Sequence, residues 1–186
     1  MKSGEASPIL PSAVESLIRT TIQSVTERGS RIAGIIGFSQ GTRVVAGLLK
    51  GAEIAARLRN EEGVSKDVLE GLDWLNFPFA VSVCGSYPPP LIPTRASEAL
   101  AKSGVAAEAQ TALVEAQIEI PTFHVQGLAD EWAWAGKLLI EQSYEVQEGK
   151  SVVLEADMGH HYPAKPEESE QLFAWIMDVY RKSLEV

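Results

Sequence analysis

Short apolar segments alternate with longer amphipathic segments along most of the chain. The apolar segments are too short to form helices, and the first is flanked by glycines, as is typical of strands buried on both faces of a sheet. These segments predict strands at residues 32–37, 79–84, 118–125 and 152–156. Apolar residues at helical spacing predict helices from Ser12 to about residue 29, from Gln40 to about residue 60 and from Pro166 onward, with Ser12 as the cap of the first.

Strands that alternate with helices of this length favour parallel βαβ units with right-handed crossovers. The sequence therefore predicts an α/β protein with a mostly parallel sheet and helices on both faces. Its 186 residues correspond to a single domain, 1–186. Between about residues 85 and 117 the connection is longer than a βα unit requires. This insertion is a candidate lid, and a solvent-facing helix pair without a functional role explains the pattern equally well.

Composition narrows the classes of function. The chain has 45% apolar and 22% charged residues, as ordinary globular proteins do, and its net charge of −9 disfavours binding to nucleic acid. Cys84 is the only cysteine, so it forms neither an internal disulfide nor, by itself, a thiolate metal site. No segment has the apolar run of a signal peptide or a membrane span. We therefore expect a cytoplasmic protein with no metal, cofactor, nucleic-acid or membrane partner.

The segment Gly37-Phe38-Ser39-Gln40-Gly41 matches the G-x-S-x-G nucleophile elbow. In that motif a tight turn between a strand and a helix holds a serine hydroxyl above the sheet, and the glycines permit the turn. The motif falls between the clearest buried strand and the clearest amphipathic helix, which is the placement that the chemistry needs. The sequence therefore predicts Ser39 as a nucleophile, with the backbone N–H of Gln40 as one donor of an oxyanion hole.

A serine nucleophile needs a base, and the chain has three histidines. His124 lies inside the third predicted strand, which favours a core or strand-surface role. His160 and His161 follow the fourth predicted strand, at the sheet edge where open α/β sheets bind ligands. One of this pair is the predicted base. We favour His160, because Gly159 before it would let the loop approach the elbow.

An aspartate is expected to orient the base. Asp130 follows the third predicted strand and would share a sheet edge with the elbow and the histidine loop. Glu131 and Asp157 are rivals, but Asp157 would have to fold back on its own loop. The chain order Ser39, Asp130, His160 is the order in which the fold built on this elbow presents its triad.

Four segments together resemble a known family: 37–41, 84–89 (Cys-Gly-Ser-Tyr-Pro-Pro), 124–130 (His-Val-Gln-Gly-Leu-Ala-Asp) and 159–163 (Gly-His-His-Tyr-Pro). In order and rough spacing they are similar to the eukaryotic serine hydrolases that include fungal polyketide-releasing thioesterases of the lovastatin-pathway type and the ovarian-tumour-suppressor-candidate hydrolase. The resemblance implies an α/β-hydrolase fold and an acyl-enzyme mechanism on a small-molecule ester or thioester. It also implies a setting in fungal secondary metabolism, with a polyketide acyl chain on an acyl carrier protein as a candidate substrate and partner.

The N-terminus departs from that family. Members begin with further strands, including a His-Gly loop that donates the first oxyanion N–H, whereas here one predicted helix precedes the nucleophile strand. We therefore expect an N-terminally shortened hydrolase domain. Residues 32–36 would then be an open sheet edge, exposed or paired in self-association. The alternative is that the chain is a catalytically weak hydrolase-fold remnant or a binding protein, as a truncated gene model would give.

Aromatic residues near the predicted site are candidates for the substrate pocket: Tyr87, Trp132, Trp134 and Tyr162. A second aromatic group, at Trp74, Phe77 and Phe79, lies before the second predicted strand, and packing is the more common role for such residues. Basic residues at positions 43, 50 and 57 recur every seven residues along one predicted helix. A solvated helix face is the favoured interpretation, and a docking surface for an acidic carrier protein is the alternative.

Overall fold

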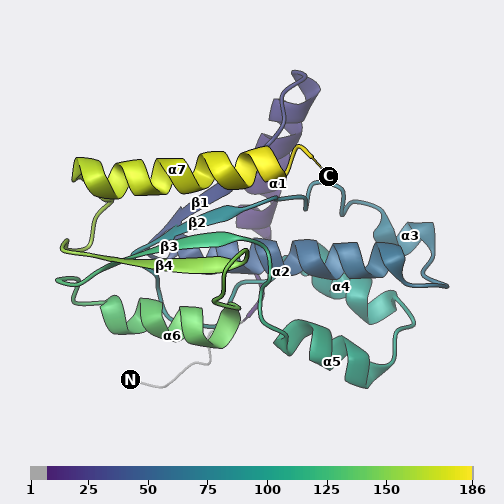
Figure 1. The fold of residues 1–186 in the computed structure, drawn as a ribbon. Coiled ribbons are helices and arrows are strands. Elements are labelled where there is room, and N and C mark those ends of the chain that lie inside the picture. Colours follow the sequence, from purple (N-terminus) through teal and green to yellow (C-terminus); the bar gives the residue numbers. More distant parts are fainter. Residues whose placement is uncertain (1–7, 186) are drawn as a thin grey trace.

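The computed structural model describes residues 8–185, and its centre is a four-stranded parallel sheet with the order β1-β2-β3-β4 (Figure 1). The strands are β1 (Ile35–Phe38), β2 (Ala80–Val83), β3 (Thr122–Gly127) and β4 (Ser151–Ala156). The helices are α1 (Ser12–Glu27), α2 (Gly41–Asn60), α3 (Lys66–Leu69), α4 (Thr94–Lys102), α5 (Ala107–Glu115), α6 (Ala133–Ser143) and α7 (Pro166–Lys182). The predicted fold class is confirmed. The predicted cap is wrong, because Ser12 is already helical and Pro11 occupies the cap position.

Helices cover both faces of the sheet (Figure 1). α2 and α6 pack on one face, and α4 and α5 contact α2 on the same side. α7 covers the other face, where Leu172, Trp175 and Ile176 pack against buried residues of β2 and β3. Because all three crossover connections lie on one face, successive strands are added in one direction and the strand order follows the chain order.

The two strands inside the sheet are buried along their whole length, as the continuous apolar runs predict. Burial of each valine, leucine or phenylalanine side chain contributes about 1.5–3 kcal/mol, so these strands form the stable centre of the fold. None of the helices in residues 8–185 is long and apolar enough to cross a bilayer.

The basic residues at positions 43, 50 and 57 of α2 do not form the expected solvated helix face. Of the three residues at seven-residue spacing, Arg43 and Lys50 are 8% and 3% exposed, and Arg57 alone lies on the surface. Arg43 donates to the carbonyl of Pro89 over 2.9 Å, and Lys50 donates to the carbonyl of Ala116 over 2.6 Å. These side chains therefore hold the 85–117 connection against α2. Neither the solvated face nor a carrier-docking stripe is formed by these three residues.

The 85–117 connection contains α4 and α5. In Figure 1 both helices lie beside the C-terminal half of α2, away from the strand end that leads into Ser39. α4 is tied to α1 as well, because the carboxylate of Glu15 accepts hydrogen bonds from the backbone N–H groups of Thr94 and Arg95. A lid function for this connection stays a prediction.

β1 is an open edge of the sheet. Within residues 8–185 it pairs only with β2, and Ile36 is 58% exposed. The N–H groups of Ile35 and Ser39 point to β2, so strand alternation turns the N–H and C=O groups of Ile36 and Phe38 outward. The opposite edge, β4, carries a surface ion pair between Lys137 and Glu155, whereas β1 has no charged residue. Among residues 8–185 β1 is thus an edge strand, as expected, and self-association through it stays a prediction.

A lysine on β1 should suppress such pairing, because a charged side chain on an edge strand opposes the addition of another strand. Ile36→Lys is expected to reduce the concentration-dependent increase in sedimentation coefficient. Val153→Lys, at a position of β4 that is 41% exposed, is the matched control and should leave that increase unchanged. Equal association by Ile36→Lys and the unaltered chain would contradict pairing through β1.

Candidate active site

Three strand ends bring polar side chains to one edge of the sheet. Ser39 follows β1, Asp130 follows β3, and His160 lies in the loop after β4. Because all four strands are parallel, their carboxyl ends share this edge. Residues that are far apart in the sequence are therefore brought within hydrogen-bonding distance.

Ser39 occupies the turn that the elbow motif predicts. Its φ of 51° lies in the left-handed region, and its N–H donates to the carbonyl of Val83 over 3.0 Å. A Cβ atom on Gly37 would lie 2.7 Å from the carbonyl oxygen of Gly41, so glycine is required at the first motif position. A Cβ on Gly41 would meet nothing within 4 Å. The backbone thus presents the Ser39 hydroxyl in a conformation that costs about 1–3 kcal/mol, as nucleophile elbows do.

His160 joins the other two side chains. Its Nε2 is 3.0 Å from Oγ of Ser39, and its Nδ1 is 2.9 Å from Oδ2 of Asp130. This geometry suits the tautomer that donates from Nδ1 to the carboxylate and accepts the serine hydroxyl at Nε2. The neighbouring His161 turns to its own loop, with Nδ1 2.8 Å from the carbonyl of Tyr162. Of the two candidate bases, His160 is therefore the one that reaches Ser39.

The Asp130 carboxylate is almost fully enclosed, with 1% of the side chain exposed. Burial acts to raise its pKa, but a hydrogen bond from the N–H of Trp132 and the hydrogen bond and charge of His160 outweigh burial and hold the pKa below its usual value. The rival acids lie elsewhere: Asp157 pairs with Lys165 at the surface, and Glu131 is exposed. Asp130 therefore stays ionised beside His160.

The histidine loop reaches Ser39 because Gly127 at the end of β3 has no side chain. A Cβ on Gly127 would lie 2.5 Å from the carbonyl oxygen of Met158 and 2.7 Å from that of Gly159. Gly159 itself has room, because a Cβ there would meet only the His161 ring at 3.8 Å. The expectation that Gly159 permits the close approach is therefore wrong. Gly127, within the sequence segment that contains Asp130, performs that role.

The backbone N–H of Gln40 lies directly after the nucleophile, at the N-terminus of α2. It has no hydrogen-bond partner among residues 8–185. An unpaired N–H at a helix N-terminus favours negative charge, so this group is available to an oxyanion formed on an acyl group at Ser39.

Two of the four predicted pocket residues, Trp132 and Tyr162, contact the triad or a ring packed against it. Phe38 places its ring 5.0 Å from that of His160 and stacks on Tyr162, also at 5.0 Å. Trp132, whose backbone N–H donates to Asp130, lies beside Trp134. The two tryptophans are 51% and 57% exposed. Tyr87 instead packs under the guanidinium of Arg43.

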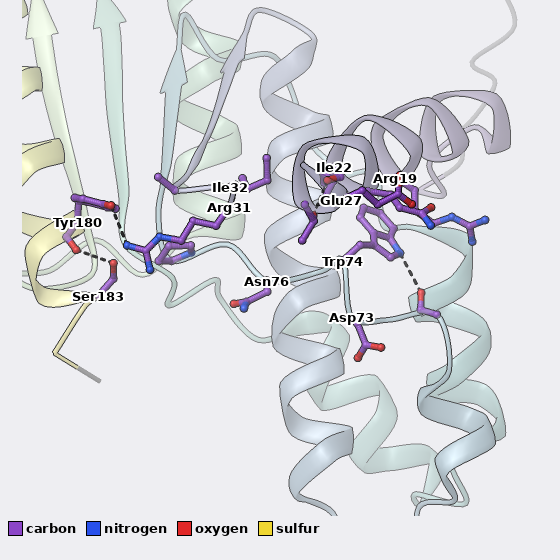
Figure 2. Close-up of a pocket in the computed structure, with 15 residues that line it drawn as sticks. Arg19, Ile22, Glu27, Arg31, Ile32, Asp73, Trp74, Asn76, Tyr180 and Ser183 are labelled. Carbon is purple, nitrogen blue, oxygen red and sulfur yellow. Dashed lines mark hydrogen bonds between the residues drawn. The ribbon is translucent and has the colours of Figure 1, made fainter. Parts of the chain in front are cut away.

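The second aromatic group lies away from the triad. Phe77 and Phe79 are buried, and Trp74 lines a cleft of about 880 Å³ between α1, residues 71–78 and the end of α7 (Figure 2). In Figure 2 Arg31 crosses to Tyr180 at one side of this cleft, and Trp74 lies under α1 at the other. None of the three triad residues lines it.

His124 is fully buried in β3 with its ring edge against Tyr144. Its ring nitrogens have no hydrogen-bond partner among residues 8–185, and burial lowers its pKa to about 3. His124 is therefore a neutral core residue. Its exclusion from the triad is confirmed.

One grouping of potential metal ligands occurs in residues 8–185: Cys84, Asp130 and His160, with donor atoms within 4.8 Å of one another. Asp130 and His160 are already bonded to each other. Burial, together with the charge of Asp130, raises the pKa of the Cys84 thiol to about 11, which disfavours the thiolate that metals bind. Hydrogen bonding explains this grouping without an ion.

A serine on a strand-to-helix turn, joined through histidine to a buried aspartate, defines the class of serine hydrolases built on an α/β-hydrolase-like sheet. The chain belongs to the serine hydrolase (FSH1) family, whose sequence profile matches residues 10–172.

Two fungal proteins are similar to this chain. Esterase FUS5 of Gibberella moniliformis is 28% identical over 151 residues, which are 81% of this chain and 48% of that protein. Esterase pigG of Monascus ruber is 26% identical over 178 residues, which are 90% of this chain and 62% of that protein. The chain thus spans roughly half to three-fifths of the length of these relatives.

A solved structure supports the fold. Esterase B of Lactobacillus rhamnosis is 15% identical, superposes with a TM-score of 0.50, and matches 91% of this chain and 61% of its own. At this level of identity the likeness concerns the arrangement of strands and helices alone.

The role of Gly127 can be tested by a pair of alanine variants. Gly127→Ala should push the Met158 and Gly159 carbonyls away from the end of β3 and move His160 from Ser39. We expect a roughly tenfold to hundredfold slower reaction of Ser39 with a fluorophosphonate, as is typical of a displacement of about 1 Å. Gly159→Ala, where a Cβ has room, is the control and should react at the original rate. Similar rates for the two variants would contradict this role of Gly127.

Proposed function

We propose that this chain is a serine esterase or thioesterase that hydrolyses acyl substrates through an acyl-enzyme. The observation that supports the proposal is the hydrogen-bond chain from Ser39 through His160 to Asp130, with distances of 3.0 and 2.9 Å. Membership of the serine hydrolase family and the similarity to two esterases point the same way.

The proposed reaction has two halves. Nε2 of His160 takes the hydroxyl proton while Oγ of Ser39 attacks the acyl carbon, and the negative charge on the former carbonyl oxygen faces the N–H of Gln40. The tetrahedral species collapses, the bond to the leaving group breaks, and His160 gives its proton to the departing oxygen or sulfur. Water then attacks the acyl-enzyme with His160 again as base, which releases a carboxylic acid and restores Ser39.

Asp130 acts through His160 in this scheme. Because its carboxylate remains ionised, it fixes the ring with Nδ1–H toward β3 and stabilises the imidazolium that forms during attack. An oxyanion donor contributes about 3 kcal/mol to transition-state stabilisation, so the N–H of Gln40 supplies a substantial part of the proposed rate enhancement.

The finer proposal concerns the acyl group. Trp132, Trp134 and Tyr162 present exposed aromatic surface and follow Asp130 and His160 in the sequence, which suits an extended apolar acyl chain. A polyketide acyl chain delivered as a carrier-protein thioester is the substrate that the sequence segments favour. Arg43 and Lys50 are buried and do not contribute to a carrier-docking surface.

Replacement of the nucleophile gives the direct test. Ser39→Ala is expected to abolish hydrolysis of p-nitrophenyl butyrate and labelling by a fluorophosphonate, with an unchanged unfolding midpoint. Ser82→Ala is the matched control, because this serine is buried in β2 and its hydroxyl has no partner within residues 8–185. Removal of such a hydroxyl leaves the fold and the reaction intact.

Two results separate the alternatives. Labelling of the unaltered chain but not of Ser39→Ala supports the enzyme. Equal turnover by Ser39→Ala and the unaltered chain excludes Ser39 as the nucleophile. A folded chain that neither hydrolyses the ester nor takes up the probe would favour the alternative function, a binding protein with a hydrolase-like fold.

The aromatic surface can be tested by acyl-chain length. Trp132→Ala and Trp134→Ala are each expected to raise KM for p-nitrophenyl decanoate by roughly tenfold, in line with the apolar area that an indole buries. KM for p-nitrophenyl acetate should change little, because an acetyl group is too short to reach both rings. Phe173→Ala, at an exposed position on α7, controls for loss of surface aromatic area in general. Parallel changes for both esters would argue against an acyl-binding role.

A further inference from the structure

The end of β2 also contributes a side chain to the active-site edge. β2 lies between β1 and β3, and its register pairs Phe38 with Val83. The next residues along the two strands, Ser39 and Cys84, therefore lie side by side. Cys84 is completely buried, and the proposed reaction gives it no role.

The backbone at Cys84 directs the side chain in an unusual way. Its φ of 47° is left-handed, as at Ser39. Strand alternation would place Cys84 on the face opposite Val83, yet Cys84 packs in the same cluster as Val81 and Val83. The left-handed conformation, which is unfavourable for a residue with a Cβ, thus turns the thiol toward the histidine loop.

The Cys84 sulfur lies against the loop that carries His160 and near the Asp130 carboxylate. Sγ is 3.4 Å from the carbonyl oxygen of His161 and 3.7 Å from that of Gly159, the two residues that flank His160. It also lies within 4.8 Å of a carboxylate oxygen of Asp130, and its proximity helps to hold the pKa of Asp130 below the usual value. One buried thiol therefore connects the end of β2, the Asp130 turn and the loop that carries His160.

The thiol is a hydrogen-bond donor in this setting. Burial first, and the negative charge of Asp130 second, raise its pKa to about 11, so it remains protonated near neutral pH. All three neighbours of the sulfur are acceptors, which suits a single S–H shared among them. An S–H directed at the ionised carboxylate is the strongest of these interactions, because charge assists it.

We propose that Cys84 is a positioning residue that holds Asp130 and the His160 loop in their mutual geometry by donating its S–H at the junction of three strand ends. The inference rests on the proposed function, since it assigns Cys84 to the support of the same Ser39–His160–Asp130 chain. The Cys84 thiol takes no part in bond making or breaking in this scheme, so Cys84 is not a catalytic residue.

Three variants test the proposal. Cys84→Ser keeps a donor, Cys84→Ala removes it, and Cys84→Gly removes both the donor and the backbone strain. For p-nitrophenyl butyrate we expect Cys84→Ala and Cys84→Gly to have a roughly tenfold lower kcat and an unchanged KM, because the loss of one hydrogen bond has about this effect. Cys84→Ser should restore most of kcat.

A merely structural role predicts a different pattern. Glycine relieves the left-handed strain, so Cys84→Gly should have a higher unfolding midpoint than Cys84→Ala. If kcat followed the unfolding midpoint, with Gly above Ala and Ser no better than Ala, the positioning role would be overturned. Retention of full kcat by Ala and Gly would overturn it equally.

A second readout does not depend on activity. His160, which bonds to Asp130, and Cys84, which lies within 4.8 Å of it, are the titratable groups that lower its pKa, and the backbone N–H of Trp132 is a further donor to it. Loss of the S–H should raise the pKa of Asp130, measured by carbon NMR of the carboxyl, in Ala and Gly but not in Ser. An unchanged pKa in all three variants refutes the inference even if the chain proves inactive. Absence of ester hydrolysis by the unaltered chain, with the pKa pattern as expected, refutes the proposed function alone.

Discussion

The active-site edge depends on one buried charge. The Asp130 carboxylate lies 1% exposed at the end of β3, and an ionised group in such a place must be paired and hydrogen-bonded. His160, the N–H of Trp132 and Cys84 provide its contacts. The same contacts hold the loop after β4 against the end of β3. His160, which lies in this loop, is thereby placed next to Ser39. The group that would orient the base therefore also determines where its loop lies.

Much of this edge could be predicted because parallel strands place their carboxyl ends together. The elbow at Ser39 is a local motif with strict backbone demands, and Asp130 and His160 each follow a predicted strand. Knowing that the strands are parallel is then enough to expect convergence. His160 rather than His161 reaches Ser39, but not for the expected reason, since Gly159 has room for a side chain and Gly127 has none. That distinction depends on which loop crosses which strand end.

The errors on α2 have a different cause. The spacing of Arg43 and Lys50 resembles a solvated stripe, but α2 is covered by the sheet on one side and by the 85–117 connection on another. A helix enclosed in this way buries long cationic side chains when backbone carbonyls are placed to receive them. Neither the left-handed turn at Cys84 nor these carbonyl partners leaves a periodic signal in the sequence. Only the folded chain shows them.

The edge position of β1 has a consequence for local stability. The strand that leads into Ser39 has a neighbour on one side only within residues 8–185, whereas the strand that leads into Asp130 is paired on both sides. Edge strands open at lower free energy than central ones, so amide hydrogens of β1 should exchange with solvent before those of β2 and β3. Such an opening would separate the nucleophile from an intact Asp130–His160 pair. On heating, the active-site arrangement would then be lost before the sheet as a whole unfolds.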